Sequence, residues 1–314
     1  MPASIVNCEN WEEADVVLLD APYDRTSSFG KGADKGPAAI KEMLDRQIEF
    51  YSRWTRRVPA DEVKIAYRDL AEQYADLAGW DVGFGESAPG EMVERVAEVY
   101  GRFFGKHWNR KFVVLLGGEH SVTNGALMAI RRECDTREVT VVQIDAHMDL
   151  RDTDADYNDK PWGKFAHSCV MRRTVEMGFN LVSVGVRAYS KDELDFALAH
   201  PNQIAFFEWG MEEAPPTSAA IVDVIQTEEV YLTVDVDGFR PASMPATGTP
   251  VQGGLEWWYG MLLIQEVFAQ KRVIGADVVE VAPRPGDSLT EYGAAQIVYD
   301  MIGAKLAKGE LGKK

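Results

Sequence analysis

The sequence predicts an α/β fold in three α-β-α layers, with a mostly parallel sheet covered by helices on both faces. Two observations predict it. Short, valine-rich runs that are apolar on both faces recur along the chain and indicate buried parallel strands. Longer segments with helical spacing of apolar residues alternate with these runs, as in parallel sheets. The sequence contains no linker, low-complexity segment or internal repeat, so we expect one domain over residues 1–314.

The expected strands are short and nearly continuous in apolar residues. They are residues 16–19, 112–116, 139–144, 181–186, 204–207, 230–236 and 273–281. The helices between them repeat apolar residues every three or four positions. The first begins with Gly36-Pro37 and carries Ile40, Leu44 and Ile48 on one side. The expected helices are residues 36–54, 91–108, 121–132, 190–200, 218–227, 255–270 and 289–305.

The composition excludes several classes of function. The chain has 33 lysines and arginines against 50 aspartates and glutamates, a net charge of −17. A chain this acidic is a poor partner for nucleic acid or for an anionic membrane. The charge suits a cationic small molecule, although surplus carboxylates more often form a solvated surface.

The chain carries the features of a cytoplasmic protein. No apolar run reaches the roughly 18 residues of a transmembrane helix, and the N-terminal residues lack the pattern of a signal peptide. Cys8, Cys134 and Cys169 are an odd number without a CxxC pair. They therefore predict neither a disulfide framework nor a zinc site.

Metal-competent side chains follow the strand expected at residues 139–144. Asp145, His147 and Asp149 stand at alternate positions, which point to one side of an extended backbone. They can therefore converge on one point at the carboxyl end of the strand. The alternative is a solvated acidic turn, because aspartate is common in loops.

Two other strands end in a similar way. Asp235 and Asp237 follow a buried strand among valines, where two carboxylates must be neutralised or bind a cation. His120 follows Gly117-Gly118 at the end of an earlier strand. A lone histidine there is more often a capping or core residue than a ligand.

Together these residues predict a site for two cations, because the strands of a parallel sheet present their carboxyl ends at one edge. The chain has five histidines, and His120, His147 and His167 all lie in these loops. Four carboxylates (Asp145, Asp149, Asp235 and Asp237) would be neutralised by two divalent ions roughly 3.5–4 Å apart. Oxygen and imidazole donors without thiolate favour Mn²⁺ over Mg²⁺, while zinc, iron or nickel could bind the same ligands.

The motifs resemble those of the ureohydrolases, the arginase and agmatinase family, and are most like agmatinase. The matching segments are residues 22–24 (PYD), 36–37 (GP), 117–121 (GGEHS), 145–149 (DAHMD), 235–237 (DVD), 247–250 (TGTP), 253–254 (GG) and 277–283 (DVVEVAP). The resemblance runs in the family's order from about residue 14 to the last helix. It implies a sheet of roughly eight strands in the arginase/deacetylase-like fold, and a homo-oligomer of three or six chains.

The resemblance also implies roles for the candidate residues. One Mn²⁺ would be held by His120, Asp145, Asp149 and Asp235, and the other by Asp145, His147, Asp235 and Asp237, with Asp145 and Asp235 bridging. A metal-bridging hydroxide would attack the guanidinium carbon, and Asp149 would pass a proton to the leaving amine. Glu280 matches the carboxylate that holds the guanidinium. His167 matches a loop histidine that shuttles protons or contacts substrate, although it could instead cap the helix that follows.

The sequence favours agmatine, hydrolysed to putrescine and urea, as the substrate. Residues 150–164 carry four aspartates in place of the Asn/Ser/Thr series of arginases, and an acidic loop would attract an amine rather than a carboxylate. Guanidinobutyrate, guanidinopropionate, aminopropylagmatine, arginine and formimidoyl compounds remain alternatives. A binding protein that kept this fold usually loses a ligand, whereas all six are present. A deacylase of the related fold would need a tyrosine and a double histidine that this chain lacks.

Two positions depart from the family pattern. Arg240-Pro241 stands where the family often has Asp-Pro, and Ala246 stands where it has glycine. Neither is a family metal ligand, so the expected effect is on the shape of the loop beside the substrate.

Overall fold

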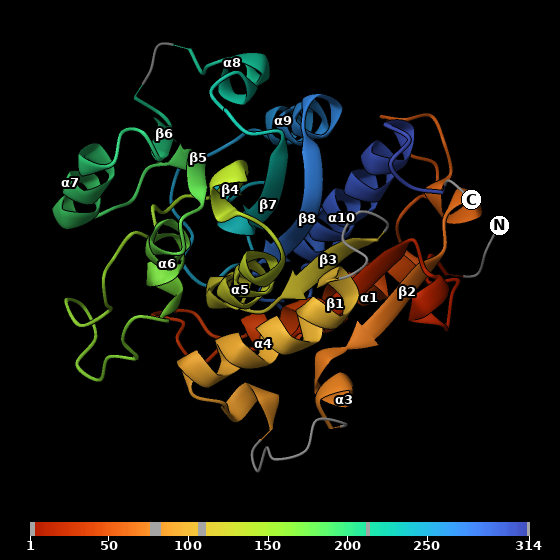
Figure 1. Ribbon diagram of the computed structural model, residues 1–314, viewed down its shortest axis with the longest axis horizontal. Coiled ribbons are helices and arrows are strands. Elements are labelled where there is room, and N and C mark those ends of the chain that lie inside the picture. Colours follow the sequence, from red (N-terminus) through yellow and green to blue (C-terminus); the bar gives the residue numbers. More distant parts are fainter. Residues whose placement is uncertain (1–3, 76–82, 106–110, 212–213, 313–314) are drawn as a thin grey trace.

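The computed structural model describes residues 4–75, 83–105, 111–211 and 214–312, and its centre is one entirely parallel sheet (Figure 1). The strand order is β2-β1-β3-β8-β7-β4-β5-β6. The strands are β1 Val16–Ala21, β2 Ile65–Asp69, β3 Phe112–Gly117, β4 Val139–Ile144, β5 Asn180–Val186, β6 Ile204–Glu208, β7 Glu229–Asp235 and β8 Arg272–Val279. The predicted α/β class is confirmed, and so is a sheet of eight strands.

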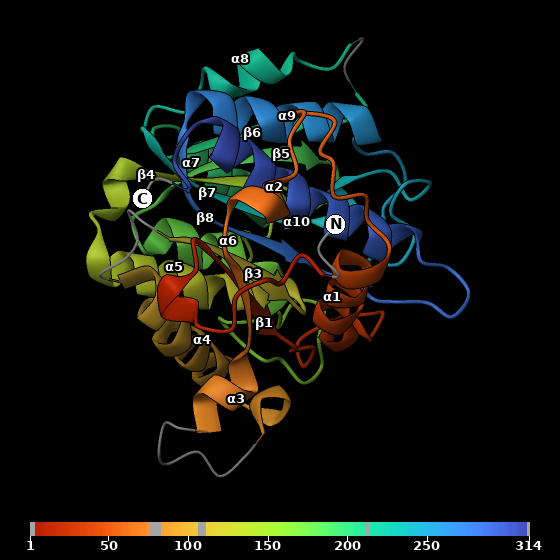
Figure 2. The same cartoon turned by 90° about the vertical axis from the view of Figure 1, so that its right-hand side faces the viewer.

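Helices cover both faces of the sheet (Figure 2). One face carries α1 Gly36–Arg46, α2 Pro59–Glu62, α8 Ser218–Val222, α9 Trp257–Gln270 and α10 Leu289–Ala307. The other carries α3 Leu70–Ala75, α4 Pro89–Phe104, α5 Thr123–Glu133, α6 Val170–Glu176 and α7 Lys191–Ala199. The structure is therefore the predicted three-layer sandwich.

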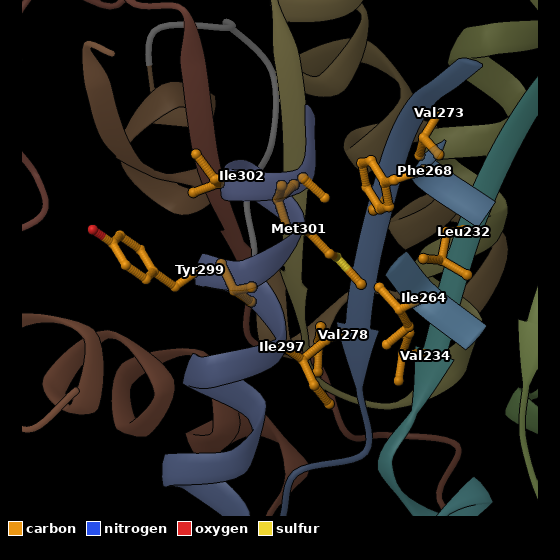
Figure 3. Close-up of a cluster of buried hydrophobic side chains, with 14 of the residues drawn as sticks. Leu232, Val234, Ile264, Phe268, Val273, Val278, Ile297, Tyr299, Met301 and Ile302 are labelled. Carbon is orange, nitrogen blue, oxygen red and sulfur yellow. The ribbon is translucent and has the colours of Figure 1, made fainter. Parts of the chain in front are cut away.

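The strands supply a hydrophobic core to each layer because successive side chains point to opposite faces. On β3, Phe112, Val114 and Leu116 join the core on one side, and Val113 and Leu115 join the core on the other. Figure 3 shows part of the first core, where side chains from α9 and α10 pack against β7 and β8. Each large apolar side chain buried in this way contributes about 1.5–3 kcal/mol.

Several predicted boundaries were wrong. The prediction missed β2, a short edge strand that pairs with β1 and ends in the polar pair Arg68 and Asp69. It also extended the first helix to residue 54, whereas α1 ends at Arg46. The helical spacing continued because Ile48 is buried in the same core, but Ser52 pairs with Arg57 in a turn. The helix expected at 91–108 is α4, which ends at Phe104, and residues 106–108 lie outside the described residues.

Two further features concern membrane-spanning helices and cysteine pairing. Within the described residues, we find no helix with the length and apolar character needed to cross a bilayer. Cys8, Cys134 and Cys169 are free thiols, as the spacing predicted.

The strand order decides where the candidate residues meet. Strands β7 and β8 come last in the chain but are inserted between β3 and β4. The carboxyl ends of β3, β8, β7 and β4 are therefore neighbours, and the register pairs Ile144 with Val234 and Asp235 with Val279. Four segments spread over 160 residues, from His120 to Glu280, reach one stretch of the sheet edge.

Candidate metal centre

The six predicted metal ligands all lie at this edge of the sheet. His120 sits in a 3₁₀ turn after β3, and Asp235 is the last residue of β7. The backbones approach closely here: a Cβ on Gly118 would be 2.0 Å from the carbonyl oxygen of Tyr23, and one on Gly238 would be 2.7 Å from the nitrogen of Asp145. Glycine at both positions therefore brings the neighbouring loops together over the sheet edge.

The side chains form two groups that share Asp145. One group is His120, Asp145 and Asp149, and the other is Asp145, His147 and Asp237. The His120 Nδ1 atom lies 3.1 Å from Asp145 Oδ2, 3.2 Å from Asp149 Oδ2 and 3.4 Å from Asp235 Oδ2. In the second group His147 Nδ1 lies 3.1 Å from Asp237 Oδ2 and 3.5 Å from Asp145 Oδ1.

The donor set fits divalent cations. The Nδ1 atom of His120 is buried and makes no hydrogen bond, although three carboxylates surround it. A lone pair that faces several carboxylate oxygens in a buried site requires a proton or a metal ion between them. Without a cation, burial opposes the charge on this ring, but Asp145, Asp149 and Asp235 override it and raise the pKa of His120 well above its usual value.

The remaining contacts of the carboxylates hold their oxygens in place. Asp145 accepts hydrogen bonds from the backbone of His147 (2.6 Å) and from the side chain of Gln143 (2.8 Å). Asp237 accepts one from the nitrogen of Ala146 at 3.0 Å, which ties the β7 loop to the β4 loop. The carboxylates are therefore oriented by the protein itself, as in preorganised metal sites.

Two of the candidate residues have a strained backbone. Asp149 has φ +53° and Glu280 has φ +64°, in the left-handed region that residues other than glycine rarely adopt. Such conformations cost about 1–3 kcal/mol each and cluster at functional sites. The Asp149 carbonyl accepts hydrogen bonds from the first turn of α6 (Met171 and Arg172), and the Glu280 nitrogen donates to the carbonyl of Gly118. The surrounding fold thus holds both conformations.

Glu280 and His167 lie beside the His120 group. Glu280 is buried, accepts a hydrogen bond from the backbone of His120 at 2.9 Å, and has Oε1 3.5 Å from His167 Nδ1. Burial opposes the charge on His167, but Glu280 overrides it and raises the pKa of His167 to about 9. The side chain of His167 faces Glu280 and Ser28, so the alternative role as a helix cap is not adopted.

A cleft of about 290 Å³ opens over the centre. Its walls bring together residues from both groups and from loops that the sequence did not single out. They are Ser28, His147, Asp149, Arg151, Tyr157, His167, Ser168, Ala188, Tyr189, Glu193, Asp235 and Thr249. A larger hollow of about 730 Å³ lies between residues 48–56, which follow α1, and helices α9 and α10, and none of the residues of the two carboxylate–imidazole groups lines it.

The loop after β4 reaches the cleft through Arg151 and Tyr157 and not through its aspartates, which corrects the argument for amine recognition. Asp154 is fully buried and accepts hydrogen bonds from the backbone of Trp162 and Gly163. Asp152 pairs with Arg173, and Asp156 pairs with Arg151. Asp154 and Asp156 thus have partners within the loop, and Asp152 has its partner in α6. None of the loop's four aspartates is among the residues that line the cleft.

The two departures from the family pattern lie outside the cleft. Arg240 is half exposed and pairs with Glu256. Ala246 is fully buried, and its nitrogen donates to Thr290 Oγ1 at 2.8 Å. The loop is therefore anchored with alanine in this position.

The sequence reasoning missed two polar residues behind the site. Glu119 is fully buried and binds the side chains of Thr26 and Ser121. Thr26 in turn accepts the backbone N–H of His167 at 2.9 Å. Burial raises the pKa of Glu119 to about 7.

Gln143 is the second of these residues and lies inside the apolar strand β4. A polar residue at a buried strand position needs a hydrogen-bond partner, and this was the signal in the sequence that could have identified it.

Comparisons with known proteins agree over most of the chain. A family model described as the Arginase family matches residues 14–303. The N(1)-aminopropylagmatine ureohydrolase of Synechocystis sp. is 34% identical over 302 residues, which cover 94% of this chain and 90% of that protein. The agmatinase of Pyrococcus horikoshii is 32% identical over 299 residues, which cover 93% of this chain and 92% of that protein. The crystal structure of Trypanosoma cruzi formiminoglutamase with Mn²⁺ matches the fold, with a TM-score of 0.79, 18% identity and coverage of 96% and 97%.

Proposed function

This chain belongs to the arginase family and is a ureohydrolase, and we propose that it hydrolyses agmatine to putrescine and urea. The observation that carries the proposal is the pair of carboxylate–imidazole groups that share Asp145, with Glu280 and His167 beside them at the cleft. In this arrangement two cations could bind next to Glu280, whose carboxylate could hold a guanidinium group.

The proposed ligands are the members of the two groups together with Asp235, whose place at both ions is taken from the resemblance to the arginase family. His120, Asp145, Asp149 and Asp235 would hold one ion, and Asp145, His147, Asp235 and Asp237 the other, with Asp145 and Asp235 shared. Mn²⁺ is the proposed metal, because the donors are oxygens and imidazoles without a thiolate. When bound, two divalent cations lower the pKa of a shared water and neutralise the charge that develops on the reacting atoms.

Glu280 is proposed to hold the substrate guanidinium. Burial raises the cost of its charge, but the neighbouring His167 overrides this effect and lowers the pKa of Glu280. The carboxylate therefore stays ionised and can accept two parallel N–H hydrogen bonds from a planar guanidinium. Its strained backbone and the hydrogen bond from His120 fix its position relative to the metal ligands.

Asp149 and His167 are proposed to manage protons. Asp149 lines the cleft with its Oδ2 atom 3.2 Å from His120 Nδ1. Its carboxylate is therefore placed to accept a proton and to pass it to the departing amine. Without a cation, burial and the nearby Asp145 raise the pKa of Asp149 to about 6. His167 lies at the cleft with Nε2 3.2 Å from Ser28 Oγ. From there it can hold a proton close to the departing amine.

Aminopropylagmatine is the second candidate substrate, because the Synechocystis relative is named for it. Its tail would carry an additional cationic amine past Tyr157, Tyr189 and Glu193 at the walls of the cleft. Arg151 also lines the cleft, but Asp156 and Glu193 pair with it. The walls therefore do not present an unpaired cation that would repel an amine.

The test is urea release by the Mn²⁺-loaded chain from agmatine, aminopropylagmatine, guanidinobutyrate, guanidinopropionate and arginine. We expect the highest kcat/KM with agmatine, and a loss of at least roughly 100-fold in Glu280→Gln because a charge-assisted contact to the guanidinium is removed. Glu256→Gln, on the surface, is the matched control. Urea from arginine or guanidinobutyrate but not from agmatine would contradict the proposed substrate.

A further inference from the structure

A second polar cluster lies behind the metal centre, on the side of His120 that faces away from the cleft. Its centre is Asp277, a fully buried residue of β8. Three hydroxyls donate to this carboxylate: Thr233 at 2.5 Å, Tyr231 at 2.8 Å and Thr123 at 2.9 Å. All three donors are fully buried. Burial raises the pKa of Asp277, while His120 and the three hydrogen bonds oppose that rise.

Thr233 links this cluster to the metal centre. Its Oγ1 atom lies 2.9 Å from Nε2 of His120, on the opposite side of the ring from the Nδ1 atom that faces Asp145 and Asp149. A threonine hydroxyl has one proton to donate and lone pairs to accept. Because that proton goes to Asp277, the hydroxyl oxygen must accept the Nε2–H of His120.

We propose that Asp277, acting through Thr233, is a positioning residue that fixes the proton of His120 on Nε2 and keeps its Nδ1 lone pair free for a metal ion. The inference rests on the proposed function and deepens it, because it says what sets the affinity of the His120 half of the site. Partners of this kind orient metal-binding histidines and make the ligand more basic.

The need for such a partner follows from burial. The side chain of His120 is 1% exposed, so the protein must supply the acceptor for its second nitrogen. The side chain of His147 is 28% exposed, so water can do so there. Only the buried histidine therefore depends on a protein relay for its tautomer.

The experiment is a titration of the metal-free chain with Mn²⁺ against a competing chelator, in four variants. Thr233→Val keeps the shape of the side chain but removes the hydroxyl, and Asp277→Asn can donate to Thr233 and so reverse the relay. We expect each to weaken one of the two Mn²⁺ sites by about 10–100-fold. Thr233→Ser should restore wild-type affinity. Tyr231→Phe removes an equally buried hydroxyl from the same carboxylate but lies off the path to His120, so both sites should keep their affinity.

The proposal is overturned if Thr233→Val binds both ions as the wild type does, or if Tyr231→Phe weakens binding as much as Thr233→Val. Thermal unfolding of each metal-free variant separates a loss of fold from a loss of affinity. If the variants do not fold, a measurement on the wild-type chain still tests the proposal. In the Zn²⁺-loaded wild type, ¹⁵N-histidine spectra should place the proton of His120 on Nε2, and a proton on Nδ1 would overturn the proposal.

These readouts are independent of the substrate. A chain that binds two ions and responds to Thr233→Val, yet releases no urea from any guanidino compound, contradicts the proposed function and supports the positioning role. Urea release by the wild type, together with unchanged Mn²⁺ affinity in Thr233→Val and Asp277→Asn, supports the proposed function and contradicts the positioning role.

Discussion

The two halves of the candidate centre use the same ligand types in different surroundings. The ring of His120 is buried, touches three carboxylates through Nδ1 and is backed by Thr233 and Asp277. The ring of His147 is 28% exposed and lines the cleft, with Asp145 and Asp237 beside its Nδ1. The imidazole of His120 is therefore enclosed by the protein and that of His147 faces the cleft, whereas Asp149 and Asp235 of the first half also line the cleft.

Ligand identity alone therefore does not set the properties of a metal site. A closed site holds its ligands in one geometry, whereas an open one leaves room for water and substrate. Asp145 belongs to both halves, so it should couple them. Substitutions in the two halves, and the response of each half to pH, test whether the halves differ.

Asp145→Ala should disable both halves at once, because this carboxylate contacts both histidines. We expect the chain to lose bound Mn²⁺ and urea release to fall by at least roughly 1,000-fold, since the main electrostatic stabilisation is gone. Elemental analysis and a urea assay on one sample measure both. Asp195→Ala, on the exposed face of α7, is the control. Retention of two ions per chain would contradict the shared role of Asp145.

His120→Asn and His147→Asn should differ if the closed and open halves differ. We expect His120→Asn to weaken Mn²⁺ binding by about 100-fold or more and His147→Asn by about 10-fold, because water can replace the more exposed ligand. His120→Asn also leaves the hydroxyl of Thr233 with a changed partner in a buried site, at a cost of about 1–3 kcal/mol. Metal titration and thermal unfolding give the two quantities. Equal losses in both variants would show that the halves are equivalent.

The stability of the metal-free chain and its affinity for Mn²⁺ should change in opposite directions as the pH rises. Without metal, burial opposes protonation of both rings, but the surrounding carboxylates raise the pKa of His120 and of His147 well above 6.5. A raised folded pKa gives stability that is complete below the unfolded pKa and is lost as the pH rises through the folded value. The metal-free chain should therefore become less stable above pH 6.5.

Cations require the neutral rings, so Mn²⁺ affinity should increase with pH as protons are displaced. Melting temperatures and Mn²⁺ titrations between about pH 6.5 and 9 test both directions around the usual histidine pKa. Affinity that falls with rising pH over this range, before metal hydroxide forms, would show that the histidines do not bind the ions.

Ala246→Gly should have the smallest effect, because residue 246 touches neither half of the centre. The methyl group is buried, and the backbone nitrogen and oxygen bond to Thr290 and Ala282. We expect a loss of about 1 kcal/mol or less from the added backbone freedom. Metal binding and KM should stay unchanged. A change in KM for agmatine would show that the loop shape, rather than the ligand set, controls the cleft.

The sequence was sufficient for the sheet class and for the ligand types. Apolar runs on both faces can only be buried between two layers, so they predicted the parallel sheet. The spacing of Asp145, His147 and Asp149 at the end of one run, and of Asp235 and Asp237 at the end of another, selected the donors that the structure brings together. These are local features, and the backbone period alone fixes them.

The neighbours of those residues depend on the tertiary structure. Insertion of β7 and β8 between β3 and β4 places Glu280 next to His120 and Thr233 behind it. The same packing buried Asp154 and paired Asp152 and Asp156 with arginines, so these aspartates do not support the sequence argument about an amine. Charge can be counted from a sequence, but the partner of a charge depends on long-range contacts that no local pattern records.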